Sequence, residues 1–546
     1  MGALRGDRLG FSTCWAISTL VLFALMVTWS FATPLGAASD EPTQMIKAAA
    51  VARGEFLGQT ATGQSVTRVG HEGRAVMTVL VPATYAEDAR LPTCFRHQPK
   101  KTAACAPAPT TSGQLTAATT YVGRYPPLYY MIVGLPSRVL HSGAGMYFMR
   151  VLSALASALL LGLALAMSAR WSRSRFLVGG VALAATPMVV FLGSVVNPSG
   201  LEIAASIAAW TTGLVLVMDH SSKPPVGLVV AFAVSSCVLE LIRGLSPFWL
   251  LLVLVTLVAL EPRGCWQLVR DGAGRIAAAV IVLTGVVATA YIVLAGATVI
   301  TPSGIPLPAH ATAWTVVNLY QAHITGYVTQ VVGDFGWLDT PAPFLVVMVI
   351  GLTIAGLVWL AIATARRRHA AVLIGLIVAS VVVPIAINVK SALQLDNDVW
   401  QSRYALPLYV GVPLVAAAIA TRSKALGPTP IRRLIVTGVW LVAGCQFVCF
   451  FAALHRYTAG VDGGLDPFAH SAGSWTPPAP TVVLLTLALV FTACYGWWIV
   501  HLDHLRSVDA TDVPAGGAEP AEPAAPSPSA RPVGEPTGTT VPAVPE

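Results

Sequence analysis

The feature that most constrains the fold is a series of apolar runs, each about 20 residues long, which is the length of helix that crosses the ~30 Å core of a bilayer. Only 11% of the 546 residues are charged, whereas soluble domains carry about 25%. The sequence therefore predicts an all-α polytopic membrane protein with about 12 transmembrane helices (11 to 13). The expected spans are 11–32, 145–168, 176–196, 199–219, 225–243, 245–260, 275–296, 344–364, 371–389, 403–421, 432–455 and 480–501.

The positions of the basic residues test this count. A further apolar stretch, Pro127–Leu140, is short and interrupted by Pro136, so we expect a helix at the outer surface that does not cross. On that reading the basic clusters all face the cytoplasm, as the positive-inside rule requires. They lie at 170–175, 223, 263–275, 366–368 and 422–433. The net charge of +8 resides largely in these clusters, so nucleic acid is not an expected partner.

This topology places both termini in the cytoplasm and two large loops outside, at 33–144 and 297–343. The transmembrane domain is expected at 1–502, followed by a Pro- and Ala-rich cytoplasmic tail, 503–546, that is too polar to bury a core and is predicted to be disordered. Ala-Ala-Ser at 37–39 also fits a signal-peptide cleavage site, and this alternative to an uncleaved first span stays open.

Two adjacent carboxylates, Asp40 and Glu41, follow the first span. They begin a segment in which Met45 and Ile46 alternate with polar residues such as Lys47, which predicts an amphipathic helix lying on the outer membrane surface. Carboxylates at a helix start commonly act only as caps. A carboxylate held at the membrane surface also suits a general base acting on an acceptor hydroxyl.

Several cations fall toward the outer membrane edge, where they could bind a phosphate. Arg124 and Tyr125 precede two prolines, and a plain interfacial anchor explains them equally well. Glu240 and Arg243 lie on one helix face and could simply pair with each other. Charged side chains at membrane depth are costly and indicate function by default. The remaining ones are Arg150, Glu202 and Arg403.

The outward loops contain two further features. Residues 333–341, Gly-Asp-Phe-Gly-Trp-Leu-Asp-Thr-Pro, combine rings and carboxylates as sugar-contacting loops do, although the same residues also make ordinary turns. Cys94 and Cys105 lie in the first outward loop, where oxidising conditions favour a disulfide between them. No cysteine spacing indicates zinc, so no metal ligands are predicted.

In order along the chain, these motifs resemble one bacterial membrane family, "domain of unknown function 2142", over about residues 11–500. The family is grouped with the GT-C glycosyltransferases. The motifs are Asp40-Glu-Pro, Pro126-Pro-Leu-Tyr-Tyr, Arg150-Val-Leu-Ser-Ala, Asn197-Pro-Ser-Gly-Leu, Gly333-Asp-Phe-Gly-Trp-Leu-Asp-Thr-Pro and Gln401-Ser-Arg-Tyr-Ala-Leu-Pro.

The resemblance implies a GT-C-like fold with juxtamembrane helices in the first outward loop, a polyprenyl-phosphate-linked sugar donor and inversion at the transferred carbon. It implies that Asp40, with Glu41 beside it, is the catalytic base. Relatives often carry His where Gln44 stands, and a basic residue where Tyr125 stands. The implied donor-phosphate residues are Arg124, Tyr125, Arg150, Arg243, Arg403 and Tyr404. The implied sugar and acceptor residues are Asn197, Glu202, Asp334, Trp337 and Asp339.

The sequence analysis thus favours a glycosyltransferase of the bacterial plasma membrane that acts on an envelope glycan or lipid acceptor. A lipid or glycan transporter or flippase is the main alternative, but the two halves of the chain show no repeat. A non-catalytic envelope-assembly protein is the third reading. The expected partners are the lipid bilayer, the lipid-linked donor and the acceptor. A requirement for Mg²⁺ or Mn²⁺ stays open, and no organic cofactor is expected.

Overall fold

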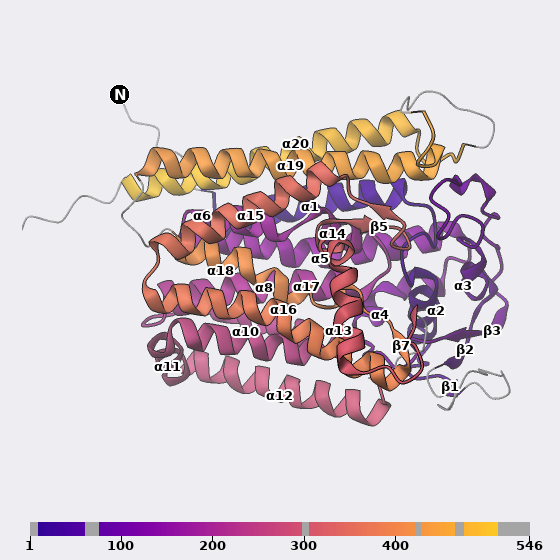
Figure 1. Ribbon diagram of the computed structural model, residues 1–546, viewed down its shortest axis with the longest axis horizontal. Coiled ribbons are helices and arrows are strands. Elements are labelled where there is room, and N and C mark those ends of the chain that lie inside the picture. Colours follow the sequence, from indigo (N-terminus) through magenta and orange to yellow (C-terminus); the bar gives the residue numbers. More distant parts are fainter. Residues whose placement is uncertain (1–8, 61–75, 298–304, 421–426, 465–473, 512–546) are drawn as a thin grey trace, which may run out of the picture. The chain divides into compact units, whose positions relative to one another are not determined.

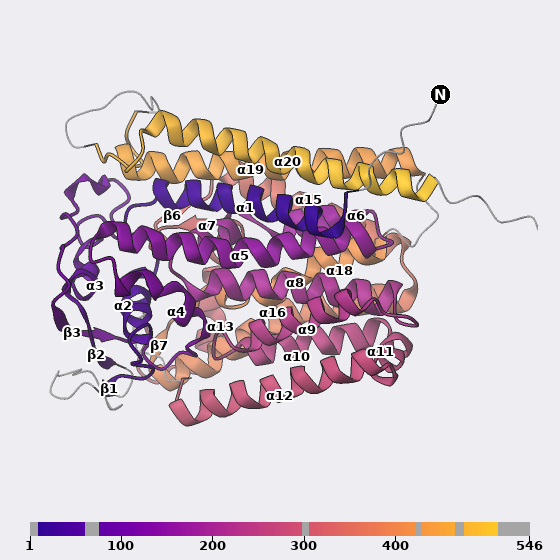
Figure 2. The same ribbon diagram turned by 180° about the vertical axis from the view of Figure 1, so that it is seen from behind.

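The computed structural model describes residues 9–60, 76–297, 305–420, 427–464 and 474–511. Contacts divide the chain into two units, residues 1–506 and 507–546, and the expected tail lies mostly outside the described residues. Within the first unit, long helices run side by side (Figures 1 and 2). They are α1 (Phe11–Ala32), α5 (Gly143–Trp171), α8 (Pro198–Asp219), α12 (Gly272–Ala295), α15 (Phe344–Thr364), α16 (Arg367–Leu395), α19 (Pro428–Ala459) and α20 (Thr481–Thr511).

These eight are the helices in the described ranges that are individually long and apolar enough to cross a membrane. Two bent pairs raise the number to ten: α6 (Phe176–Ala184) with α7 (Pro187–Ser194), bent by 58°, and α10 (Ser246–Leu260) with α11 (Pro262–Arg270), bent by 108°. Pro187 and Pro262 stand at the first positions of the second helices, where a ring is tolerated after a break.

The remaining two expected spans form shorter apolar helices, α9 (Val226–Glu240) and the stretch Leu406–Ala420, which comprises α17 (Leu406–Tyr409) and α18 (Gly411–Ala420). All twelve apolar runs are therefore helical. The prediction of an all-helical polytopic membrane protein is confirmed, while length and composition support eight to ten spans and leave the count of twelve a prediction.

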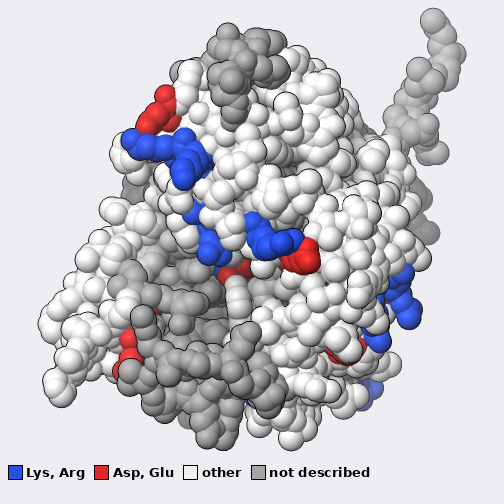
Figure 3. Space-filling view, turned by 90° about the vertical axis from the view of Figure 1, so that its right-hand side faces the viewer, with Lys and Arg blue, Asp and Glu red and all other residues white. Residues whose placement is uncertain are grey.

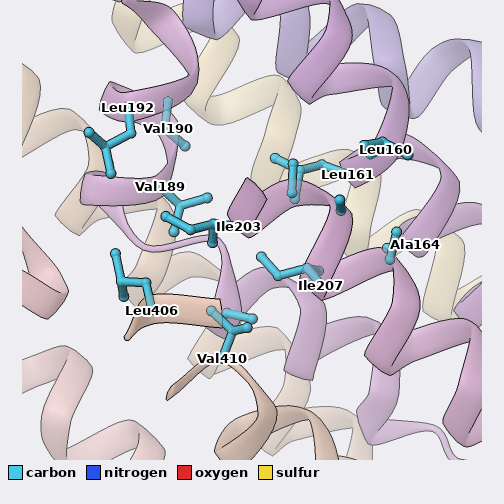
Figure 4. Close-up of a cluster of buried hydrophobic side chains, with 14 of the residues drawn as sticks. Leu160, Leu161, Ala164, Val189, Val190, Leu192, Ile203, Ile207, Leu406 and Val410 are labelled. Carbon is cyan, nitrogen blue, oxygen red and sulfur yellow. The ribbon is translucent and has the colours of Figure 1, made fainter. Parts of the chain in front are cut away.

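The centre of the bundle is formed by α1, α5, α7 and α8, in which α5 and α7 each contact the other three helices. Figure 4 shows part of this core, where Leu161 and Ala164 of α5, Val190 of α7 and Ile207 of α8 pack together. Small residues permit this close approach: a Cβ atom on Gly162 would lie 2.4 Å from Thr19 Oγ1 of α1. By contrast, α12, α15 and α16 expose most of their apolar side chains, as lipid-facing helices do.

One end of the bundle, which we call the loop end, carries the segment between α1 and α5 (right-hand side of Figure 1). Its helices are α2 (Glu41–Val51), α3 (Ala83–Ala86), η1 (Asp88–Arg90), η2 (Ala103–Cys105), α4 (Leu128–Val133) and η3 (Leu135–Arg138). Its strands, β1 (Gln59–Thr60), β2 (Met77–Pro82) and β3 (Leu115–Thr120), pair antiparallel in that order, with Met77 opposite Thr120.

Two expectations about this segment have different outcomes. The stretch Pro127–Leu140 forms only the short α4 and η3, too short to cross, and exposes Met131, Leu135 and Val139. The helix after Asp40 was expected to lie on the membrane surface, and this is wrong: every residue of α2 is buried. Its polar face packs against β2, β3 and α4, and Lys47 donates hydrogen bonds to the Phe56 and Gly123 carbonyls.

The second loop and the chain before α17 complete the loop end. They contain α13 (Ala313–Ala322), α14 (Ile324–Val332), η4 (Ser402–Tyr404) and the two-stranded pairs β4 (Ile305–Pro306) with β7 (Asn397–Asp398) and β5 (Asp334–Phe335) with β6 (Thr340–Pro341). Ser39 N donates to Gly336 O at 2.9 Å, so the β5–β6 turn lies directly against the start of the first loop.

Packing at Gly162 gives a stability prediction. Gly162→Val should lower the melting temperature of the purified protein by several degrees, because overpacking a tight helix contact costs about 1–3 kcal/mol. Gly351→Val is the matched control, since a Cβ atom at this exposed position of α15 meets nothing within 4 Å. Equal melting temperatures for the two variants would contradict the close α1–α5 contact.

Candidate active site

Asp40 is the carboxylate around which the candidate site is arranged. Its backbone is left-handed, with φ of 64°, and its side chain makes no capping bond to α2 within the described structure. Tyr121 Oη, just after β3, donates a hydrogen bond to Asp40 Oδ1 at 2.5 Å, and Arg403 of η4 forms an ion pair with Oδ2. The side chain is 24% exposed. Helix capping therefore does not explain Asp40, whose carboxylate instead contacts one phenol and one guanidinium.

Two arginines and two tyrosines extend this cluster. The Tyr404 ring contacts both Arg403 and Arg243, whose guanidinium carbons are 5.4 and 5.1 Å from its centre. The Tyr125 ring lies 5.9 Å from the Arg243 guanidinium. Rings hold a guanidinium in place through cation–π contact and leave its N–H groups free for other partners. Arg243, Arg403, Tyr125 and Tyr404 thus form one cluster with Asp40, and their role in binding a donor phosphate stays a prediction.

Glu202 holds Arg243 in position. Its carboxylate lies 3.3 Å from Arg243 Nη1 and accepts a hydrogen bond from Ser246 Oγ at 2.7 Å. Glu202 is buried, so it supports the arginine rather than a sugar. The pairing of Arg243 with Glu240 considered from the sequence is wrong. Glu240 instead packs against α12, where a Cβ atom on Gly285 would lie 2.7 Å from its Oε1.

Glu41 and Arg150 form a second ion pair, entirely enclosed in protein, since both side chains are 0% exposed. Arg150 donates to both Glu41 oxygens, at 2.7 and 2.6 Å, and Glu41 Oε1 also accepts from Val196 N. The other Arg150 donors bind backbone carbonyls at the end of α1, those of Ser30, Thr33 and Pro34. Neither residue can reach a substrate here, so we reassign both from catalysis and phosphate binding to positioning Asp40.

The residues expected to contact sugar or acceptor also bind the start of the first loop. Asn197 caps α8 by accepting from Ser199 N, and its Nδ2 donates to Ser39 O at 3.2 Å. Trp337 Nε1 donates to Gly36 O at 3.0 Å. Asp339 pairs with the buried Arg456 of α19 at 3.0 Å. Asn197 and Asp339 are thus structural supports, while Trp337 is partly exposed beside the cluster.

Three positions complete the comparison with the sequence expectations. Arg124 is half-buried and makes no hydrogen bond or ion pair to any residue that the structure describes, so it is not joined to the cluster. Cys94 and Cys105 form the expected disulfide. Tyr121 was missed, because nothing in its sequence context distinguishes it from the other tyrosines of the loop. Only the pairing of the chain after β3 with Asp40 singles it out.

Asp334 has an unusual environment in the β5–β6 turn. Burial, reinforced by the nearby Asp339, raises the pKa of its carboxyl to about 7, and its Oδ1 has no hydrogen-bond partner within the described structure. Burial likewise raises the pKa of the Tyr125 phenol, which keeps it protonated at neutral pH. Among the described residues no three His, Cys, Asp or Glu side chains converge in a group that could hold a metal ion.

Comparison with known protein families identifies the family of this chain. The model of a family described as "Predicted membrane protein (DUF2142)" matches residues 23–412, more than half of the sequence. The chain belongs to this family. The match includes Asp40, Tyr121, Arg243 and Arg403, so the whole cluster lies within the DUF2142 region. The prediction made from the motifs is confirmed.

None of the curated proteins compared with the chain matches it. A matching solved structure is the crystal structure of ArnT from Cupriavidus metallidurans bound to undecaprenyl phosphate, with 15% identity over 91% of this chain and 78% of that chain. Its TM-score of 0.40 is too low to carry an argument about this DUF2142 protein.

The Glu41–Arg150 pair gives the second prediction. Glu41→Gln should destabilise the protein by about 3–5 kcal/mol, because removing one partner leaves a buried charge uncompensated. The control is Asp462→Asn in the exposed Lys100–Asp462 pair, which should cost about 0–1 kcal/mol. Thermal melts of both variants measure this, and equal losses would contradict a supporting role for the buried pair.

The third prediction concerns the effect of Asp334 on how stability depends on pH. Because folding raises the pKa of the Asp334 carboxyl, ionisation of that carboxyl destabilises the folded state. The free energy of unfolding therefore falls as the pH rises from the pKa of the unfolded state through the pKa of the folded state. Relative to Asp334→Asn, the wild type should therefore lose up to about 4 kcal/mol as the pH rises from 4 to 8, and the loss should level off above about pH 8. Melting curves across pH 4–8 measure the difference, and a pH-independent difference would contradict it.

Proposed function

We propose that this protein is a membrane glycosyltransferase of GT-C type, which transfers a sugar from a polyprenyl-phosphate donor to an envelope glycan or lipid acceptor on the extracytoplasmic face. The observation that carries the proposal is the meeting of a partly exposed carboxylate with two ring-stacked arginines at the loop end. The positive-inside rule predicts that this end faces outward, where a lipid-linked donor and an envelope acceptor are both available.

The proposed mechanism uses the Asp40 carboxylate as a base and the two guanidinium groups as a phosphate-binding site. Asp40 takes the proton of the acceptor hydroxyl as its oxygen attacks the anomeric carbon. The bond between that carbon and the phosphate oxygen breaks, and its electron pair leaves with the polyprenyl phosphate. Arg403 and Arg243 stabilise the negative charge that develops on the phosphate. Attack opposite to the leaving group inverts the anomeric configuration.

The ion pair between Asp40 and Arg403 has a consequence for this mechanism. A carboxylate paired with a guanidinium is a poor base, because protonation would forfeit the pair. A donor phosphate competes for Arg403, since it offers more negative charge and more acceptor oxygens than one carboxylate. Donor binding thereby releases Asp40, whose carboxylate then keeps only the Tyr121 hydrogen bond. We therefore expect the donor to bind before the acceptor.

The fourth prediction distinguishes the role of Asp40 from the role of the two arginines. Asp40→Asn should reduce sugar transfer at least about 100-fold, the usual size of a general-base contribution. It should leave undecaprenyl-phosphate binding intact or stronger, because Arg403 loses its competitor. Arg403→Gln and Arg243→Gln should each weaken that binding. Native mass spectrometry measures binding, and a panel of labelled undecaprenyl-phosphate sugars measures transfer by the purified full chain.

Two controls make the test specific. Undecaprenol, which lacks the phosphate, should bind wild type and arginine variants alike. Asp462→Asn, which removes an exposed acid at the same end, should not lower transfer. Unchanged transfer by Asp40→Asn would refute the assigned base. Movement of the lipid-linked sugar across vesicle membranes without any transfer would instead establish the transporter alternative.

A further inference from the structure

A disulfide-closed loop at the loop end concentrates positive charge. This basic loop, residues 94–105, contains Arg96, His97, Lys100 and Lys101 and no acidic residue, and Cys94 and Cys105 join its ends. All four side chains are exposed. In Figure 3, which shows this end of the molecule, basic side chains form a broken band from the upper left to the centre, and acidic side chains adjoin the band at both of its ends.

The basic loop is held rigidly from beneath. Arg456 at the end of α19 is buried and donates to three of its carbonyls, those of Phe95, Gln98 and Lys101, at 2.8, 3.3 and 2.8 Å. Val461 N donates to Pro99 O at 3.0 Å. The backbone that carries the cations is therefore fixed before any ligand arrives, which reduces the entropy lost on binding.

The basic loop also adjoins the Asp40 cluster. The Arg96 guanidinium stacks 4.7 Å from the Trp337 ring centre, and His97 N donates to Asp339 Oδ2 at 3.1 Å. Trp337 in turn binds Gly36 O, in the short segment that leads to Asp40. One ring thus separates the exposed cations from the chain that positions the carboxylate.

Internal partners neutralise only part of this charge. Lys100 pairs with Asp462 at 2.8 Å, with both side chains mostly exposed. Arg96 and Lys101 have no carboxylate partner among the residues that the structure describes. Two exposed cations on a fixed backbone, with no carboxylate partner in the described part of the chain, attract anionic ligands and orient them.

We propose that the basic loop binds anionic groups of the acceptor, so that the acceptor is a glycan bearing carboxylates or phosphates; this rests on the proposed transferase function. Arg96 offers a planar fork that suits either anion, and Lys101 a point charge next to it. The carbohydrate between its charged groups can then pass Trp337 toward Asp40. An anionic membrane surface fits less well, because surface-binding segments insert apolar side chains and the described basic loop exposes no large hydrophobic residue.

Binding in the absence of donor tests the proposal separately from transfer. The full chain, reconstituted in phosphatidylcholine nanodiscs, is titrated with hexagalacturonate and with neutral maltohexaose by calorimetry. Hexagalacturonate should bind, and maltohexaose should bind at least about ten-fold more weakly. Arg96→Glu/Lys101→Glu should weaken hexagalacturonate binding by about five- to ten-fold, and high salt should weaken wild-type binding similarly. Arg96→Gln/Lys101→Gln should show a smaller loss and guards against misfolding of the reversal variant.

The matched control is Arg367→Glu, which reverses an exposed charge at the opposite end of the bundle and should bind as wild type does. Equal binding by wild type and both loop variants would overturn the proposal, as would equal binding of the neutral hexasaccharide. Capture of phosphatidylglycerol vesicles through the same residues, without hexagalacturonate binding, would overturn it in favour of a lipid surface. Absence of transfer with every donor would refute the transferase function, whatever these titrations show.

Discussion

The buried ion pair between Glu41 and Arg150 is the interaction on which the loop end depends. Arg150 joins the last turn of α1, the start of α2 and its own helix α5 through bonds that leave none of its surface to solvent. Enclosed charges are stable only when each partner is fully paired and hydrogen-bonded. The chain between α1 and α2 therefore has one arrangement, and Asp40 is held in its left-handed conformation within it.

Around this ion pair, the residues that support the site are more deeply buried than Asp40 and Arg243. Glu41, Arg150, Glu202 and Asn197 are enclosed and bind protein, whereas Asp40 and Arg243 keep some exposed surface. Arg403 is itself only 3% exposed, but its partner Asp40 is 24% exposed, so a ligand that displaces the Asp40 carboxylate reaches this arginine. The site is thus built as a rigid inner layer of polar supports and a thin outer layer whose partners can change.

The sequence predicted the helices well because apolar length and basic clusters are read directly from the chain. It also identified Asp40, Arg243 and Arg403 as candidates. It could not assign partners: the spacing of Glu240 and Arg243 puts them on one helix face, but the choice of Glu202 depends on how α8 and α9 pack. The surface location predicted for α2 failed for the same reason, since its polar residues find buried partners that sequence periodicity does not reveal.

The contact between Arg456 and the basic loop has a consequence for biosynthesis. Phe95 and Arg456 are 361 residues apart, so at 5–20 residues per second the arginine is added to the chain about 20–70 s after Phe95. During that interval the first loop lacks the α19 support and the β5–β6 turn that later fix it. The disulfide between Cys94 and Cys105 joins neighbours and can form at once. It keeps the early loop closed until the last third of the chain arrives to complete it.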